Sequence, residues 1–172
     1  MNNRPDILLI QEFYPRNAEL FSELMASVEW DDSMTARKTA SFGKPYDYSQ
    51  MSYQATEMPP CLEDVAEHLR EQLGVQFNNC LLNLYETGLN TMGFHSDETE
   101  NLLPGTGVAI VSLGSERTIT FRSLDQTILV DYCLKPGSLL YMGLEVQDHW
   151  MHAIRKQEIA ELRISLTWRA IR

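Results

Sequence analysis

Residues 161–171 read ELRISLTWRAI, and apolar and polar side chains alternate along this segment at every second position. The apolar members are Leu162, Ile164, Leu166 and Trp168, and the polar members are Arg163, Ser165, Thr167 and Arg169. An alternation with a period of two is typical of a β-strand, in which successive side chains point to opposite faces of a sheet. The segment therefore predicts a strand with one apolar and one polar face.

Six more strand-like runs precede this segment, each separated from the next by turn residues. They are QFNNCLLNLYE (76–86), GVAIVSLG (107–114), RTITFRS (117–123), TILVDYCL (127–134), GSLLYMG (137–143) and DHWMHAIR (148–155). Short strands that recur every 8–12 residues or so are typical of a sandwich or small barrel rather than a parallel α/β sheet. The fold class that follows is α+β, mainly β.

The N-terminal part has a different pattern. It predicts a strand at 6–13, a helix at 17–29, a polar region with scattered aromatic residues at 30–58, and a second helix at 62–73. Asn17 is a candidate N-cap for the first helix, and Gly74 is positioned to end the second. The expected arrangement is two N-terminal helices that support an all-β sandwich, whose open end could hold a ligand.

Composition sets the class of protein. A length of 172 residues is that of one domain, so we expect a single domain at 1–172. No run of about 18 uncharged apolar residues is present, and the first residues do not match a secretion signal, so we expect no membrane segment. The three cysteines have no CxxC spacing, which favours reduced thiols in a cytoplasm over disulfides or a zinc site.

The charge balance indicates which kinds of partner the protein can bind. The chain has 14 basic and 24 acidic residues, for a net charge of −10. Proteins that bind nucleic acid usually present a basic face to the phosphates. Overall charge therefore disfavours a polyanionic partner unless the cations gather locally.

A candidate metal site begins with His95 and Asp97 in the sequence GFHSDETE. On an extended segment, residues i and i+2 point to the same side and could bind one ion. Two imidazoles and one carboxylate form the facial set that binds Fe(II) in non-haem oxygenases. The second imidazole would come from His68, His149 or His152. His68 lies in a helical pattern and fits a solvated helix residue better, but the residue pattern leaves His149 and His152 open.

The polar face of 162–171 adds a second feature. Such a face ordinarily points into water. If it points inward, Arg163 and Arg169 place two guanidinium groups inside the protein, where they need anionic partners. The planar guanidinium binds carboxylates in a bidentate manner, so a dicarboxylate such as 2-oxoglutarate would match the pair.

Four segments together resemble the AlkB-type Fe(II)/2-oxoglutarate-dependent dioxygenases. They are LLNLYETG with Asn83 and Tyr85, His95-Ser-Asp97, HWMHAI with His152, and RISLTWR at 163–169, and MTARKTASFG at 34–43 is similar to the substrate-side strand of that family. The resemblance implies a double-stranded β-helix (jelly-roll) core at about 77–170 and a substrate-recognition lid at about 30–58. It also implies an iron site formed by His95, Asp97 and His152.

The same resemblance assigns the co-substrate pocket. Arg163, assisted by Tyr85, would pair with the distal carboxylate of 2-oxoglutarate, and Asn83 and Arg169 would lie toward its iron-chelating end. Ser165 stands where the family often has Asn. The implied cofactors are Fe(II), 2-oxoglutarate and O₂, and the implied reaction oxidises a C–H bond of the substrate.

The family most often demethylates N-alkylated bases in DNA or RNA, with release of formaldehyde, succinate and CO₂. A flipped base would stack on aromatic side chains, for which the sequence offers Phe42, Tyr46 and Tyr48. Three nearby cations, Arg37, Lys38 and Lys44, could contact phosphates.

Two features weigh against a nucleic acid. One is the net charge. The other is Thr99, which stands four positions after His95, where members that act on bases often have an acidic residue; Glu98 and Glu100 are its neighbours. The alternative is a hydroxylase or demethylase of a small molecule, free nucleotide or peptide. A binding module without catalysis is disfavoured because the ligand set is intact, and we expect the protein to be a monomer.

Overall fold

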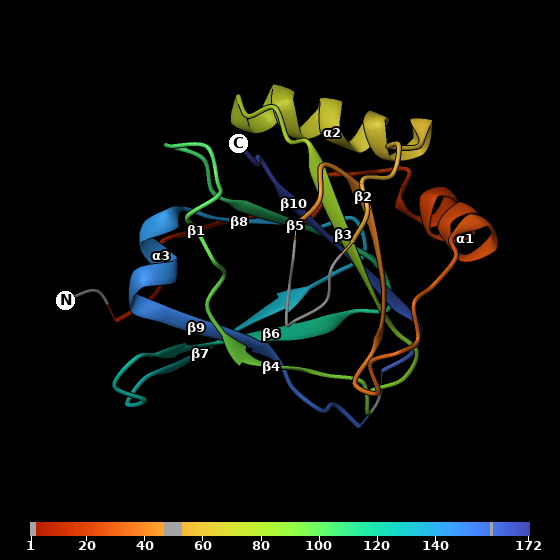
Figure 1. Ribbon diagram of the computed structural model, residues 1–172. Coiled ribbons are helices and arrows are strands. Elements are labelled where there is room, and N and C mark those ends of the chain that lie inside the picture. Colours follow the sequence, from red (N-terminus) through yellow and green to blue (C-terminus); the bar gives the residue numbers. More distant parts are fainter. Residues whose placement is uncertain (1–2, 47–52, 159) are drawn as a thin grey trace.

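The computed structural model describes residues 3–46, 53–158 and 160–172 (Figure 1). The elements in chain order are β1 (Ile7–Ile10), α1 (Asn17–Ser27), β2 (Lys38–Gly43), α2 (Pro60–Leu73), β3 (Asn79–Tyr85), β4 (Met92–His95), β5 (Val108–Gly114), β6 (Arg117–Ser123), β7 (Leu129–Leu134), β8 (Leu139–Met142), α3 (Leu144–His149), β9 (Trp150–Ile154) and β10 (Arg163–Arg169).

In the described part of the chain, ten strands form two sheets. The larger has the order β1-β8-β5-β10-β3-β2, the smaller the order β4-β9-β6-β7, and every pairing is antiparallel. In Figure 1 the two sheets face each other, and α1 and α2 lie outside the larger one. This is the mainly β, jelly-roll architecture with two supporting helices that the sequence predicts.

The strand β10 lies in the middle of the larger sheet, between β3 and β5. Ser165 is opposite Asn83 on one side and Ser112 on the other. All seven residues of β10 are buried, so neither face of this strand points into water. Its apolar residues Ile164, Leu166 and Trp168 pack in the core beneath the helices. The polar face must then point into the space between the sheets.

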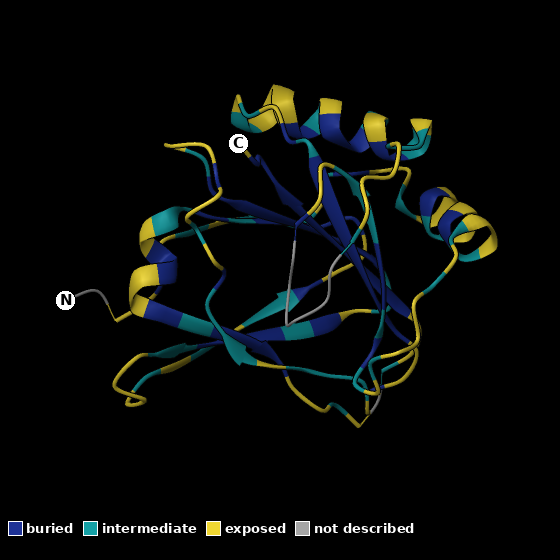
Figure 2. Cartoon of the chain, in the orientation of Figure 1, coloured by how far each residue is buried: buried dark blue, intermediate teal, exposed yellow. Residues whose placement is uncertain are grey.

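The helices cover the outer face of that sheet, with one side buried and the other exposed (Figure 2). Leu24 of α1 and Leu62 and Leu69 of α2 are fully buried in the same core as Trp168. Gly74 ends α2 in the left-handed region at φ 69°, as predicted. Asn17 is not the N-cap of α1: Arg16 takes that position, and the Asn17 amide donates to the Tyr14 carbonyl oxygen instead.

Two short elements differ from the sequence prediction. The run 148–155 is not one strand, because α3 extends through His149 and β9 begins at Trp150. The strand β4 was not predicted as an element, since its four residues are too few to show a period. Together these elements place His152 on a strand and His149 on an exposed helix end. Among the described residues, no helix combines the length and apolar character needed to cross a membrane.

Candidate metal centre and co-substrate pocket

The two imidazoles of the site come from neighbouring strands of the smaller sheet. In the antiparallel pairing of β4 with β9, His95 lies directly opposite His152. Their ring centroids are 4.3 Å apart, so the two side chains lie on the same face of this sheet. The residue pattern left His149 and His152 open, and strand register places His152 beside His95.

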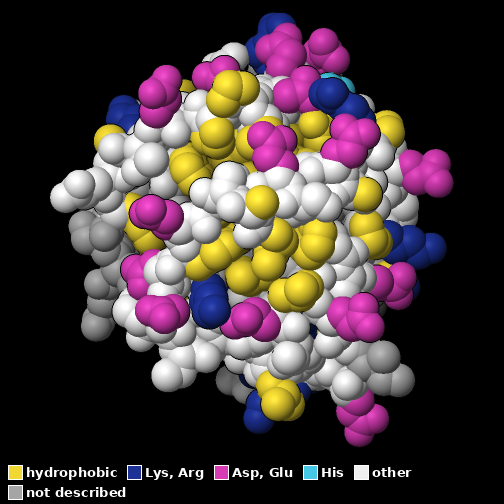
Figure 3. All heavy atoms as spheres, turned by 90° about the vertical axis from the view of Figure 1, so that its right-hand side faces the viewer, with side chains coloured by type: hydrophobic (Ala, Val, Ile, Leu, Met, Phe, Trp, Pro, Cys, Tyr) yellow, Lys and Arg dark blue, Asp and Glu magenta, His cyan; other side chains and the backbone are white. Residues whose placement is uncertain are grey.

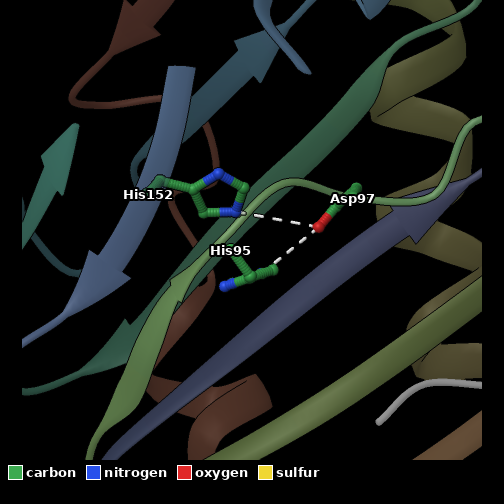
Figure 4. Close-up of side chains that lie close together, drawn as sticks. All are labelled: His95, Asp97 and His152. Atoms are coloured by element: carbon green, nitrogen blue, oxygen red, sulfur yellow. Dashed lines mark ion pairs between the residues drawn. The ribbon is translucent and has the colours of Figure 1, made fainter. Parts of the chain in front are cut away.

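The carboxylate of Asp97 completes the group (Figure 4). One ligand atom from each of His95, Asp97 and His152 lies within 4.8 Å of the others. The Asp97 Oδ1 atom is 3.3 Å from His95 Nε2 and 3.7 Å from His152 Nε2. The strand β4 ends at His95, so Asp97 reaches the site from the segment after the strand and not from an extended i, i+2 pair.

Burial and charge keep these groups in forms that bind metal. Burial lowers the pKa of His152 to about 4, although the nearby Asp97 raises it. Burial would raise the pKa of the Asp97 carboxyl, but Arg169 and the two histidines more than offset this and hold it well below its usual range. At neutral pH the site thus contains a carboxylate and an uncharged His152 imidazole, which are ligand forms.

Two contacts fix the Asp97 segment. Arg169 Nη2 donates to Asp97 Oδ2 at 2.9 Å, and both side chains are almost fully buried. The Asp97 backbone N–H donates to Gln147 Oε1 at 2.8 Å. Gln147 lies in α3, which leads directly into β9 and His152. The helix α3 therefore ties together the two segments that carry the ligands.

The polar face of β10 forms a buried cationic floor beside the three ligand groups. Arg163 is 1% exposed, and its Nη2 donates to Ser112 Oγ at 2.9 Å. Its Nε and Nη1 atoms have no hydrogen-bond partner among the described residues. Burial, with a further contribution from Arg117, lowers the pKa of Arg163 to about 10, although Tyr85 raises it. An anion that reached this floor would supply the missing partners.

A cavity lies between the two sheets. It is lined by Leu81, Asn83, Tyr85, Met92, His95, Asp97, Ile110, Ile119, His152, Ile154, Arg163, Ser165, Thr167 and Arg169. All eight residues predicted for the metal and the co-substrate are among them. Apart from His95, Asp97 and His152, its polar residues lie on β3 and β10, and its aliphatic residues come from both sheets.

A family model described as "2OG-Fe(II) oxygenase superfamily" matches residues 9–169. The chain belongs to this superfamily. The oxygenase is similar to human "DNA oxidative demethylase ALKBH2", with 32% identity over 178 residues that cover 89% of this chain and 68% of the relative. It is also similar to human "Alpha-ketoglutarate-dependent dioxygenase alkB homolog 3", with 31% identity over 147 residues, 78% of this chain and 51% of the relative.

A solved structure described as "The structure of OsALKBH1" has the same fold. The TM-score is 0.74, with 15% sequence identity, and the match covers 98% of the oxygenase and 100% of the other chain. Family and fold together make this protein an AlkB-like dioxygenase that uses Fe(II), 2-oxoglutarate and O₂.

The residues of the oxygenase fit both cofactors. Two imidazoles and a carboxylate are the ligand set that leaves coordination positions open for a chelating co-substrate and O₂. Among the residues that the structure describes, buried N–H groups of Arg163 and Arg169 and the Asn83 Nδ2 atom have no hydrogen-bond partner. Buried donors without acceptors are unfavourable in an empty protein. A dicarboxylate, which carries only acceptors, is the complementary ligand.

The residues predicted to bind the substrate do not all lie at the cavity. Tyr46 is buried, and its ring centroid is 3.9 Å from the Arg169 guanidinium carbon, but it does not line the cavity. Phe42 packs into the core beneath the helices and does not line the cavity. Glu98 is exposed and Thr99 is half-buried just beyond Asp97. Tyr48 lies outside the described residues.

The three cations proposed to contact phosphates are engaged within the protein. Arg37 is 5% exposed, and its Nε donates to Asn83 Oδ1 at 2.8 Å. Lys38 pairs with Glu86 at 3.1 Å, and Lys44 donates to the Arg172 carbonyl oxygen. The prediction is wrong for Arg37, because burial keeps it from a polyanion.

Sequence reasoning missed three residues that support the site. They are Gln147, which holds Asp97; Ser112, which holds Arg163; and Arg37, which holds Asn83. Ser112 lies at a buried position of the apolar run 107–114, where a lone hydroxyl is a detectable signal. The other two carry no signal in the sequence, because each acts on a residue about 50 positions away.

Proposed function

We propose that the protein removes N-linked alkyl groups from nucleic acid bases by oxidation, with iron held by His95, Asp97 and His152. The observation that carries this proposal is the convergence of these three ligand groups beside the buried floor of β10. The similarity to a DNA oxidative demethylase supports the substrate class. When bound, iron with O₂ and 2-oxoglutarate supplies oxidation of a C–H bond, coupled to formation of succinate and CO₂.

The protein contributes position and environment to this reaction. Arg163 would bind the distal carboxylate of 2-oxoglutarate, with Tyr85 beside it and Ser165 on the floor next to Ser112. Arg169 and Asn83 would lie nearer the metal, Arg169 through its bond to Asp97. Aliphatic side chains such as Ile110, Ile119 and Ile154 keep water from the reacting carbon. A hydroxylated N-methyl group then breaks down to formaldehyde and the restored base.

The substrate would enter past the lid, for which we propose residues 30–58. Tyr46 supports the wall at Arg169, while Glu98 and Thr99 border the site after Asp97. The roles of Phe42 and Tyr48 in stacking remain predictions. Phe42 would have to leave the core beneath the helices to meet a base.

A second candidate, a small molecule, free nucleotide or peptide as substrate, is favoured by the charge distribution. The net charge is −10, and Arg37, Lys38 and Lys44 are engaged internally. On the face that carries α1, acidic side chains are scattered among hydrophobic ones, and the described side chains in view form no continuous basic track (Figure 3). A polyanion would therefore gain little electrostatic attraction on this face.

One experiment separates the two candidates. The iron-loaded protein is incubated with 2-oxoglutarate, O₂ and a panel of N-methylated DNA and RNA oligonucleotides, free methylated nucleosides and methylated peptides. Formaldehyde release from oligonucleotides above that from nucleosides supports the proposal. Release from nucleosides or peptides alone favours the small-molecule candidate, and Asp97→Ala serves as the control without a metal site.

We further infer a monomeric protein of the cytoplasm. All three cysteines are free thiols, and Cys80 is fully buried among apolar side chains, where burial raises its pKa well above the ordinary value. Reduced thiols are the usual state in a reducing compartment. Light scattering of the purified protein and fractionation of cells test these two inferences.

A further inference from the structure

A hydrogen bond joins the side chains of Arg37 and Asn83. Arg37 immediately precedes β2, and Asn83 lies on the neighbouring strand β3, where its side chain lines the cavity. Arg37 Nε donates to Asn83 Oδ1 at 2.8 Å, and Arg37 Nη1 donates to the Thr91 carbonyl oxygen at 3.2 Å. Arg37 is 5% exposed and Asn83 is fully buried.

This bond decides which end of the Asn83 amide is available to a ligand. The guanidinium is a donor only, so the group that faces Arg37 must be the acceptor Oδ1. The other end, Nδ2, is buried and has no hydrogen-bond partner among the described residues. Arg37 therefore holds the amide so that its donor end is left for the cavity, which contains anion-binding groups along β10.

We propose that Arg37 is a positioning residue for 2-oxoglutarate, which orients the Asn83 amide so that the pocket presents a donor and not an acceptor to a carboxylate. This rests on the proposed location of 2-oxoglutarate beside Arg163. If the amide rotated by half a turn, Oδ1 would face the carboxylate and repel it. The guanidinium prevents this because rotation would bring two donors together.

The same bond joins the proposed lid to the co-substrate pocket. The backbone next to Arg37 is bonded to the β3–β4 connection: Thr91 N–H and Asn90 Nδ2 both donate to the Ala36 carbonyl oxygen, each at 3.1 Å. The strand that follows, β4, carries His95. A displacement of the 36–37 segment would therefore disturb the Asn83 amide, and 2-oxoglutarate binding would in turn favour the bonded position of Arg37.

The test compares Arg37→Met, Asn83→Ala and the double variant. Methionine retains much of the apolar volume of arginine and removes its donors. The dissociation constant of 2-oxoglutarate is measured by calorimetry with Mn(II) in place of iron, so the readout does not depend on turnover. Each single variant is expected to weaken binding about tenfold, the effect of losing one hydrogen bond to a charged group. Because both act through one amide, the double variant is expected to be no weaker than Asn83→Ala.

Asn90→Ala is the matched control. It removes the bond to the Ala36 carbonyl oxygen, together with the bonds that Asn90 Oδ1 accepts from the Glu86 and Thr87 backbone N–H groups. The Arg37–Asn83 pair is left intact. A lower melting temperature with unchanged 2-oxoglutarate affinity is expected for this variant. If it weakens 2-oxoglutarate as much as Arg37→Met does, Arg37 acts only as an anchor of the segment and the proposal is wrong.

Asn83→Asp provides a variant that keeps the bond to arginine. An aspartate can still accept from Arg37, but it has no donor to offer, so 2-oxoglutarate should bind more weakly than to the native protein while the fold remains intact. Two failures are distinguishable. If Asn83→Ala and Asn83→Asp leave the affinity unchanged, the proposed pocket is wrong; if they weaken it and Arg37→Met does not, only the role of Arg37 is wrong.

Discussion

Replacement of Arg163 with methionine is expected to change the stability of the empty protein and its affinity for 2-oxoglutarate in opposite directions. Methionine can occupy much of the apolar volume of the arginine side chain without its charge. The variant should unfold at the same or a slightly higher temperature than the native protein, while binding of 2-oxoglutarate should weaken strongly. If the arginine had a purely structural role, its replacement would lower the melting temperature and leave the affinity for 2-oxoglutarate unchanged.

The stability change follows from the buried charge. Burial lowers the pKa of Arg163 from 12.5 to about 10, and a difference of about 2.5 in pKa corresponds to about 3 kcal/mol against the charged form. Removal of the guanidinium relieves this, whereas loss of its contacts with Ser112 and Tyr85 costs about 1 kcal/mol each. The net gain is about 1 kcal/mol, which raises the melting temperature of a chain of this size by about 2–4 °C.

The affinity change follows from the two atoms left for a ligand. Arg163 Nε and Nη1 have no partner among the described residues, so a carboxylate could form two charge-assisted hydrogen bonds there. At about 1.5–3 kcal/mol each, their loss corresponds to roughly a 10²- to 10⁴-fold weaker dissociation constant.

Calorimetry with Mn(II) and 2-oxoglutarate gives the affinity, and differential scanning calorimetry of the metal-free protein gives the melting temperature. Arg70→Met, at an exposed position on α2 paired with Glu67, is the control and should change neither quantity much. A variant at Arg163 that binds 2-oxoglutarate within threefold of the native affinity, or that loses many degrees of stability, would refute this reasoning.

Three further predictions concern the metal ligands, their support and the core. Asp97→Ala should abolish metal binding. It should also lower the free energy of unfolding of the metal-free protein by about 3–5 kcal/mol, because Arg169 is left as a buried charge without its carboxylate partner. Urea denaturation measures this loss, and an unchanged midpoint would contradict it. Gln147→Ala should weaken Mn(II) binding by about 10- to 100-fold, because the Asp97 backbone N–H loses its acceptor. Gln147→Glu keeps an acceptor oxygen and should recover much of the affinity in a metal titration. Equal losses in both variants would contradict a positioning role. Leu69→Ala, in the fully buried core beneath α2, should lower the free energy of unfolding by about 2–5 kcal/mol. The affinity of the folded variant for 2-oxoglutarate should be unchanged. A loss of affinity at temperatures where the variant is folded would show that the helix layer also shapes the pocket.

Much of the fold could be predicted because it depends on local patterns. The alternation in residues 162–169, the repeated short runs and the apolar faces of the two helices are set by the pairing of side-chain type with backbone period. Gly74 ended α2 as expected, since a residue without Cβ tolerates a positive φ. These features identify a mainly β protein with two supporting helices before any contact between distant residues is known.

Short elements, and the N-cap of α1, could not be predicted in this way. The strand β4 has four residues and α3 has six, too few to show a period. Asn17 was a reasonable candidate for the N-cap, but its amide bonds to the Tyr14 carbonyl oxygen instead. At Asn17, a hydrogen bond to a residue only three positions earlier takes the place of the expected N-cap contact.

For the site, the sequence alone determined the candidate groups: an HxD pair, a set of histidines and two arginines on one face of a strand. Only the tertiary structure decided that this face points inward, because β10 lies between β3 and β5 in a sheet covered by helices. It also decided that His152 and not His149 faces His95, because strand register is a relation between segments that lie far apart in the chain. The supports from Arg37 and Gln147 belong to the same class, since a hydrogen bond across about 50 residues leaves no periodic trace in a single sequence.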